Sequence, residues 1–315
     1  MSMGKSLLIG NGLNRSLSNS IAWSNILKEV ADEYHVEYNA DIPMPLEFER
    51  IVNKILSVHI NPSKDLYLEI KKKVADKLKN VQLPQDALHY DLHNLELDAI
   101  LTTNYDFLLE YVYNQGFEYK GENKKYLFSP TSIQQNVKFY HLHGMISDPN
   151  SICLGYEHYI GLVQKLRQEL NTKKGNIQEQ MAKRQVLLNL EPPRDTWGER
   201  FYTSDIYILG LGLAHCETDL WWLLTHRAYL YYSDYCGLRK HIKNKILYFD
   251  IVNDIKKTVL DDEIKRYKQE IEQKNKHLLL EANHVQVVTC KLSLFDGSYT
   301  DAYRSIIQQI SNGEN

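Results

Sequence analysis

The sequence predicts an α/β fold: a Rossmann-like, mostly parallel sheet with helices on both faces and helical insertions. Short apolar runs suited to buried strands alternate along the chain with longer amphipathic segments suited to helices, the order typical of parallel sheets. The 315 residues are 43% hydrophobic and 24% charged, an ordinary composition for a globular protein with a sizeable core. The strands are unevenly spaced and show no internal repeat, so we expect a single domain over residues 1–315.

The first predicted strand, 6–10, runs into a glycine turn, and helical segments follow it. Apolar residues recur at helical spacing over 23–34, and two further apolar stripes, punctuated by prolines, continue to residue 95. We therefore expect a helical insertion at about 20–95. Five more strands are expected at 98–102, 138–143, 205–210, 245–251 and 285–289.

Helices are expected between and after these strands. A highly charged stretch with a Lys-Lys-Gly break predicts a second helical insertion at about 160–195. The charges of the predicted helix 262–281 are most simply a solvated face, although Ile264, Ile271 and Leu278, at intervals of seven, could pack against a partner helix. The remaining helices are expected at 106–114, from 212 through 224 and at 301–310.

Composition excludes several classes of function. The net charge of −3 gives no electrostatic reason to expect nucleic acid as the main ligand. The four cysteines form no CxxC pair, which argues against a zinc ribbon and for free thiols; Cys216 beside His215 could be catalytic, but nothing marks a lowered thiol pKa. The first apolar run is too short for a signal peptide and no stretch suits a membrane span, so we expect a cytoplasmic protein.

Two glycine turns suggest a site for a dinucleotide. Gly10 and Gly12 follow the first strand, where glycines let the backbone approach a phosphate and the next helix offers free N–H groups. Asn14, Arg15 and Ser16 would add side-chain donors. The pattern is GxGxxR rather than GxGxxG, so a tight strand-to-helix turn that binds nothing is the alternative.

A second turn repeats this arrangement later in the chain. Gly210 and Gly212 follow the 205–210 strand, and Asp219 lies in the helix that comes next. Asp250 ends a further strand, where a carboxylate can hold ribose hydroxyls, although helix capping is an equal alternative. Two such turns in one sheet favour a dinucleotide site more strongly than either does alone.

Asn104 and His143 are the candidates for chemistry. Each follows a short apolar run, and the carboxyl ends of strands are where open α/β sheets bind ligands. The Asn104 amide can donate and accept at once, so it could position a water or a ribose hydroxyl, with helix capping as its alternative role. The His143 imidazole titrates near neutrality and could act as a general base, where a lone histidine would more often be structural.

Histidine pairs raise the possibility of a metal. His141 and His143 are two apart on a predicted strand, and His89 and His93 are four apart, so each pair could share a face. Neither pair has an obvious third ligand, and the second lacks the glutamate of the HExxH zinc motif. We therefore expect no metal.

Taken together, these motifs resemble the sirtuin-like NAD-consuming family, in its bacterial branch of antiphage-defence NAD hydrolases. The matching pieces are the Gly10–Ser16 loop, Thr102-Thr103-Asn104-Tyr105-Asp106, Leu142-His143-Gly144, and Gly210-Leu211-Gly212 with Asp219. The resemblance implies that NAD is bound as the substrate by the glycine turns together with Thr103, Asp106, Asp219 and Asp250. By the same match, Asn104 would orient the nicotinamide ribose and the attacking water, and His143 would be the general base.

The implied activity is hydrolysis of the nicotinamide–ribose N-glycosidic bond, which gives nicotinamide and ADP-ribose and depletes NAD in abortive infection. The chain lacks the paired CxxC motifs of protein-deacetylating sirtuins, which argues against an acyl-lysine substrate. Control would come from a homo-oligomer or a separately encoded activator, such as a nucleotide-sensing subunit or a ring ATPase. The alternative is a catalytically silent subunit that binds NAD or ADP-ribose; a nicotinamide-dependent oxidoreductase has less support, because no Tyr-x-x-x-Lys pair stands out near the glycine turns.

Overall fold

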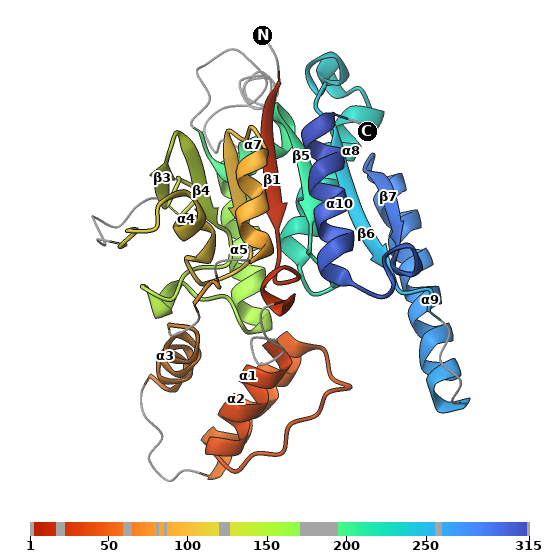
Figure 1. The fold of residues 1–315 in the computed structure, drawn as a ribbon. Helices are drawn as coiled ribbons and strands as arrows, with labels where there is room; N and C mark the ends of the chain where they lie inside the picture. Colours follow the sequence, from red (N-terminus) through yellow and green to blue (C-terminus); the bar gives the residue numbers. More distant parts are fainter. Residues whose placement is uncertain are drawn as a thin grey trace.

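A computed structural model describes residues 3–16, 23–58, 65–79, 82–84, 87–119, 127–170, 195–255 and 260–313. Within these ranges, seven strands form one sheet in the order β3-β4-β2-β1-β5-β6-β7 (Figure 1). All neighbouring pairs run parallel except β3 and β4. The strands are β1 (Gly4–Ile9), β2 (Ala99–Thr102), β3 (Ser132–Gln134), β4 (Val137–His141), β5 (Ser204–Leu209), β6 (Ile246–Val252) and β7 (Gln286–Lys291).

The six parallel strands follow the order of doubly wound dinucleotide-binding folds. This confirms the predicted Rossmann-like α/β class, and each predicted strand overlaps an observed one. The short edge strand β3 was not predicted. It pairs with β4 through a tight turn in which Gln135 and Asn136 both have positive φ, the backbone that two-residue hairpins require.

Alternate residues of the central strands enter two different apolar cores. In β1, Leu8 belongs to one core, and Leu7 and Ile9 belong to the other, because successive side chains of a strand point to opposite faces. The helices that contribute to the first core are α5 (Tyr156–Leu170), α7 (Trp197–Thr203), α8 (Thr218–Tyr232) and α9 (Leu260–Ala282). Those that contribute to the second are η3 (Leu88–Asn94), α4 (Leu108–Tyr113) and α10 (Tyr299–Asn312). Helices therefore cover both faces, as predicted.

A third apolar core lies beyond the carboxyl ends of the strands. It is built by α1 (Trp23–Glu33), α2 (Met44–Val58) and α3 (Leu66–Leu78), and these helices sit below the arrowhead of β1 in Figure 1. Tyr105, Ile152 and Leu154, from loops after β2 and β4, join this core. We call α1–α3 the cap, because they lie over the edge of the sheet where ligands of such folds bind.

The cap falls in the range of the first predicted insertion. Of the second, only residues up to 170 and residue 195 are described, and 171–194 lie outside the described residues. A single domain with two inserted helical segments stays a prediction. No helix in the described part of the chain is long and apolar enough to cross a membrane.

Candidate functional site

The two glycine turns lie side by side at the point where the strand order reverses. Strands β1 and β5 are neighbours, so the loops that leave their carboxyl ends start together. The Gly10 N–H donates to the Leu209 carbonyl at 3.2 Å, and the Gly12 N–H donates to the Gly210 carbonyl at 2.7 Å. The structure therefore brings together the two turns that the sequence singled out.

Three of the four positions require glycine, two because of close packing and one because of its backbone conformation. A Cβ atom on Gly10 would lie 2.7 Å from the Leu211 Cα, and one on Gly12 would lie 2.6 Å from the Gly210 Cα. Gly210 itself has φ +62°, a backbone that favours glycine. Gly212 differs, because a Cβ there would meet nothing within 4 Å. Of the four, Gly212 is thus the one that faces open space.

Asn104 joins the end of β2 to the first glycine turn. Its side chain is 1% exposed, and its Nδ2 donates to the Gly10 carbonyl at 3.3 Å. Its backbone N–H donates to Oγ1 of Thr102 at 3.0 Å, which fixes the turn after the strand. The amide oxygen Oδ1 is buried and has no hydrogen-bond partner within the described residues. Because buried polar atoms are rarely left unpaired, this oxygen is an acceptor available to a ligand.

His143 is held by Asp219. The ring Nε2 donates to Oδ2 of Asp219 at 3.0 Å, and both side chains are buried. Burial alone would lower the pKa of His143, but the charge of Asp219 and this hydrogen bond outweigh burial and raise the pKa above its ordinary value. With the proton held on Nε2, the neutral ring presents the Nδ1 lone pair, and Nδ1 has no hydrogen-bond partner in the described parts of the chain.

The surroundings of this pair come from elements far apart in the sequence. Asp219 lies in the first turn of α8, and its second oxygen, Oδ1, is buried without a partner among the described residues. Tyr159 of α5 sets its ring edge-on to His143, with ring centroids 5.2 Å apart. The Cys153 N–H donates to the His143 carbonyl at 2.8 Å, which ties the histidine to the loop under the cap. The sequence predicted Asp219 as a cofactor contact, whereas its observed partner is His143.

Glu217 is a site residue that the sequence reasoning did not single out as such. It precedes α8, and its carboxylate accepts the Ala214 N–H at 2.7 Å. Burial raises the pKa of Glu217 to about 7, although the charge of His143 works against this shift. The sequence offered one indication of this residue. Glu217 lies two positions before Asp219, at the start of a predicted helix that follows a strand.

Asn14 and Asp106 bind each other. Asn14 donates its Nδ2 to Oδ2 of Asp106 at 2.8 Å, and its Oδ1 accepts Nε2–H of His89 at 2.8 Å. All three side chains are buried. Asp106 also accepts the Leu108 N–H at 3.1 Å at the start of α4. This geometry favours a structural role for Asn14 and Asp106, and their predicted contact with a cofactor stays a prediction.

The other predicted contacts differ in how accessible they are. Arg15 is exposed beside the first glycine turn, while Thr103 is buried and its N–H donates to the Ile9 carbonyl at 3.2 Å. Of Ser16, the backbone is described and the side chain is not. Asp250 accepts His277 Nε2–H at 2.6 Å and Gln273 Nε2–H at 2.8 Å, so its carboxylate is engaged by α9.

In each of the two histidine pairs that the sequence suggested as metal ligands, the two rings have different hydrogen-bond partners. His141 donates from Nδ1 to the Asn104 carbonyl at 2.9 Å and from Nε2 to Oε1 of Glu110 at 3.0 Å, so it braces the backbone of Asn104. His93 contacts the Val112 carbonyl, whereas His89 contacts Asn14. Within the described residues, no group of three or more His, Cys, Asp or Glu side chains is arranged to hold a metal ion.

Part of the chain is similar to a known protein family. No curated protein matches the chain. Residues 98–188 match a family model described as a SIR2-like domain. The matched segment includes Asn104 and His143, and it begins just before β2. This part of the chain is therefore similar to SIR2-like domains.

Proposed function

We propose that the protein is an NAD glycohydrolase that cleaves the bond between nicotinamide and ribose. The observation that carries the proposal is the buried His143–Asp219 pair together with the buried Asn104, because Asn104 and His143 follow the carboxyl ends of the neighbouring parallel strands β2 and β4. A sensor that only binds NAD needs no oriented base, whereas hydrolysis uses one. The SIR2-like match, which includes Asn104 and His143, supports NAD as the substrate.

Each residue has a distinct task in this proposal. The unpartnered Oδ1 of Asn104 accepts from a ribose hydroxyl or from the attacking water. His143 receives a proton at Nδ1, and Asp219 keeps the Nε2 proton in place and stabilises the charged ring that results. Cationic nicotinamide is a good leaving group. Cleavage therefore depends on orientation and nearby polar stabilisation more than on a strong nucleophile.

The phosphates of NAD would lie along the open side of the glycine turns. Gly212 borders open space and Arg15 is an exposed cation at the first turn. Glycine backbone and a positive side chain are the groups that commonly cradle a pyrophosphate. Gly10 and Gly12 would then act indirectly, by allowing the two turns to pack.

The biological setting in this proposal rests on the family resemblance. An enzyme that exhausts NAD is toxic, so it needs control, and we place it among effectors of antiphage defence that are controlled by self-association or a separate activator. Full NAD hydrolysis by the purified monomer alone would contradict this form of control.

The test is to follow NAD loss and nicotinamide release by chromatography. Wild type is compared with Asn104→Ala and His143→Ala, and with Asn53→Ala, an exposed position on α2, as the matched control. We expect turnover in the wild type and the control, and its loss in both site variants that still melt cooperatively. Turnover that survives both site substitutions would overturn the site. Intact NAD bound without turnover would point either to the catalytically silent NAD-binding subunit or to an enzyme that lacks its activator, and the proteins that co-purify with the chain from its native cell would then be identified.

A further inference from the structure

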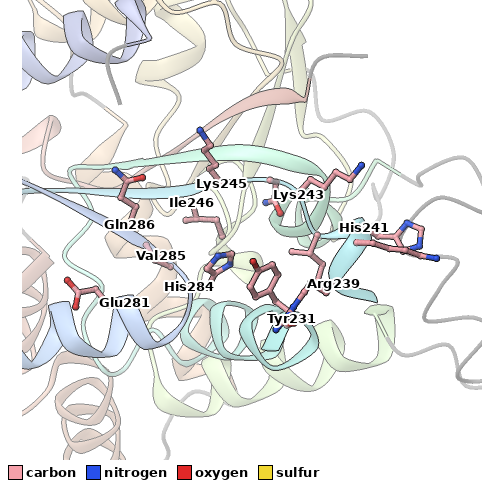
Figure 2. A pocket seen from close by; sticks show the side chains of 13 residues that line it. Tyr231, Arg239, His241, Lys243, Lys245, Ile246, Glu281, His284, Val285 and Gln286 are labelled. Carbon is pink, nitrogen blue, oxygen red and sulfur yellow. Dashed lines mark hydrogen bonds between the residues drawn. The ribbon is translucent and has the colours of Figure 1, made fainter. Parts of the chain in front are cut away.

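A large cavity lies at the amino ends of the strands, whereas the proposed catalytic residues follow their carboxyl ends. Its volume is about 1000 Å³, and it is bordered by the starts of β6 and β7, by η6 (Tyr235–His241) and by the end of α9 (Figure 2). Ile246 and Gln286 of its lining begin their strands, whereas Asn104 and His143 follow the carboxyl ends of theirs. A molecule bound here would not contact the proposed catalytic residues.

The lining of this cavity is strongly basic. Four lysine and arginine residues and one glutamate border it, a formal charge of +3, against −3 for the whole chain. These charged residues are Arg239, Lys240, Lys243, Lys245 and Glu281. Since the rest of the chain therefore carries −6, positive charge is concentrated in this basic pocket, and such a concentration attracts anions.

The wall of the basic pocket is fixed by buried hydrogen bonds. Arg227 has no exposed surface; it donates to the Asn244 carbonyl at 2.5 Å and to the His284 carbonyl at 3.2 Å. Asn244 in turn donates to the carbonyls of Phe201 at 3.0 Å and Ser204 at 2.8 Å. The segments that carry Lys243, Lys245 and His284 are thus held to the core before any ligand arrives.

One cation of the pocket is already oriented. The guanidinium of Arg239 lies 5.1 Å from the centre of the Tyr231 ring, and its Nε donates to the Tyr231 carbonyl at 3.0 Å. His284 stacks on the same ring, with centroids 3.9 Å apart (Figure 2). Burial, followed by the charge of Arg227, lowers the pKa of His284, so the ring stays neutral and keeps a donor for an anion.

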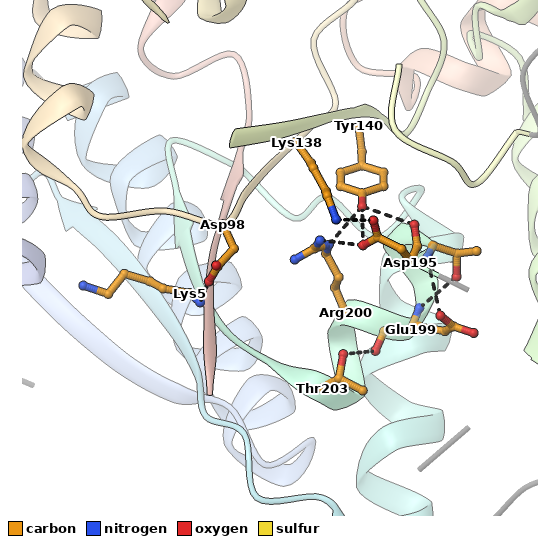
Figure 3. A network of polar contacts seen from close by, with 9 residues as sticks. Lys5, Asp98, Lys138, Tyr140, Asp195, Glu199, Arg200 and Thr203 are labelled. Carbon is orange, nitrogen blue, oxygen red and sulfur yellow. Dashed lines mark hydrogen bonds and ion pairs between the residues drawn. The ribbon is translucent and has the colours of Figure 1, made fainter. Parts of the chain in front are cut away.

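A second cavity, of about 350 Å³, lies at the amino ends of β1 and β5 and differs in its charge. There Lys138 and Arg200 both bind Asp195, at 2.5 and 2.6 Å (Figure 3). With Asp98 and Glu199 also in the lining, the formal charge of this cavity is −1. In the basic pocket, Lys240, Lys243 and Lys245 form no ion pair with the described residues. These lysines are therefore open to an anion that the described residues do not supply.

We propose that the basic pocket binds a small ligand that carries several phosphates, such as a nucleoside triphosphate. The volume lies within the range of small-molecule sites, and the fixed wall with lysines on the rim suits a compact polyanion. A nucleic acid strand would extend past the pocket over a chain that is otherwise acidic, which favours the small ligand. Helix α8 separates the two sites: Asp219 lies in its first turn and Tyr231 in its last, roughly 18 Å apart at 1.5 Å per residue.

Binding is tested by titration calorimetry with inorganic tripolyphosphate and with ATP. The full chain carries His143→Ala, so that the result does not depend on NAD turnover. The test variant adds Lys243→Gln and Lys245→Gln; the matched control adds Lys268→Gln and Lys274→Gln, two exposed positions on α9. We expect the control to bind both probes and the test variant to bind them at least about tenfold more weakly, with affinity falling as salt rises.

Three results would overturn the proposal. The first is no binding of either probe to the control, and the second is equal affinity in the control and the test variant. The third is a single-stranded 12-nucleotide DNA that binds more tightly than tripolyphosphate and loses affinity in the test variant, which would make the pocket a nucleic-acid site. Hydrolysis of NAD is measured on separate variants, so failure here leaves the proposed function standing.

Discussion

His89 is a buried titratable ring whose only hydrogen bond in the described structure joins Nε2 to Asn14. Its Nδ1 is buried without a partner among the described residues, and burial lowers its pKa to about 4 from 6.5. The folded pKa lies below the unfolded one, so the unfolded chain takes up the proton first as pH falls. Neutral His89 therefore stabilises the fold fully only above about pH 6.5, and the stability is lost between that pH and about 4.

Replacement of His89 by glutamine should remove this acid sensitivity. Glutamine keeps an N–H donor for Asn14 but does not titrate. Between pH 7.5 and 5, we expect the wild type to lose about 2 kcal/mol more of its free energy of unfolding than His89→Gln does. Urea unfolding at both pH values measures the difference, and equal losses in the two proteins would show that His89 is charged in the fold.

Asp219 should matter for the state of His143 more than for binding of NAD. In Asp219→Asn, the charge that raises the His143 pKa is gone, and the amide can donate to Nε2 and so favour the wrong tautomer. We expect NAD turnover to fall roughly 10²- to 10⁴-fold, with NAD affinity, measured by calorimetry, within threefold. In the wild type, turnover should decline as pH falls through the raised pKa, because a protonated ring accepts no proton. Undiminished turnover in Asp219→Asn would contradict the assigned role.

The positions of Asn104 and His143 could be predicted from sequence, but their partners could not. Each follows an apolar run, and that pattern alone places a side chain at the carboxyl edge of a sheet. The His143–Asp219 contact spans 76 positions and joins a turn after β4 to a helix after β5. Asn14 was predicted as a ligand contact from the first glycine turn and Asp106 from the family resemblance, but the two bind each other across 92 positions. Strand-end position does not reveal which polar groups will pair with one another.

At the level of elements, the glycine turns behave as one packed unit. A Cβ on Gly12 would meet the Tyr303 hydroxyl and would lie 2.6 Å from the Gly210 Cα, so the turns would have to separate. We expect Gly12→Ala to lower the free energy of unfolding by about 1–3 kcal/mol. Gly212→Ala, from the other turn, is the matched control and should change it by less than about 0.5 kcal/mol. Denaturant unfolding compares them, and equal effects would show that the turns do not depend on this contact.

Short apolar runs predicted the parallel strands, but no such run marks β3. Its three residues, Ser132–Gln134, carry one apolar side chain, Ile133, which is exposed. Pairing with β4 depends on the positive φ of Gln135 and Asn136 rather than on burial. Sequence periodicity reports burial, so it finds core strands and misses an edge strand whose one apolar side chain faces solvent.

For the whole molecule, the helical content of residues 20–95 was predictable but the placement of the cap was not. The apolar stripes of α1–α3 say that these helices bury one face, without saying against what. In the structure they bury it against each other and against Tyr105, Ile152 and Leu154. Tyr105 is next to Asn104, and the loop of Ile152 and Leu154 binds the backbone of His143 through Cys153. The cap therefore packs directly against the segments that position Asn104 and His143.

This arrangement predicts where NAD should protect the backbone from hydrogen exchange. Ligands slow exchange in segments whose opening would release them. With NAD added to His143→Ala, which does not turn it over in our proposal, we expect slower exchange in α2, in the loop at 103–106 and in the turn at 210–213. Exchange in η6 and at the start of β7, which border the basic pocket, should not change. Tripolyphosphate should give the reverse pattern. Protection of η6 by NAD would indicate that the dinucleotide binds in the basic pocket. The His143–Asp219 pair would then need another explanation.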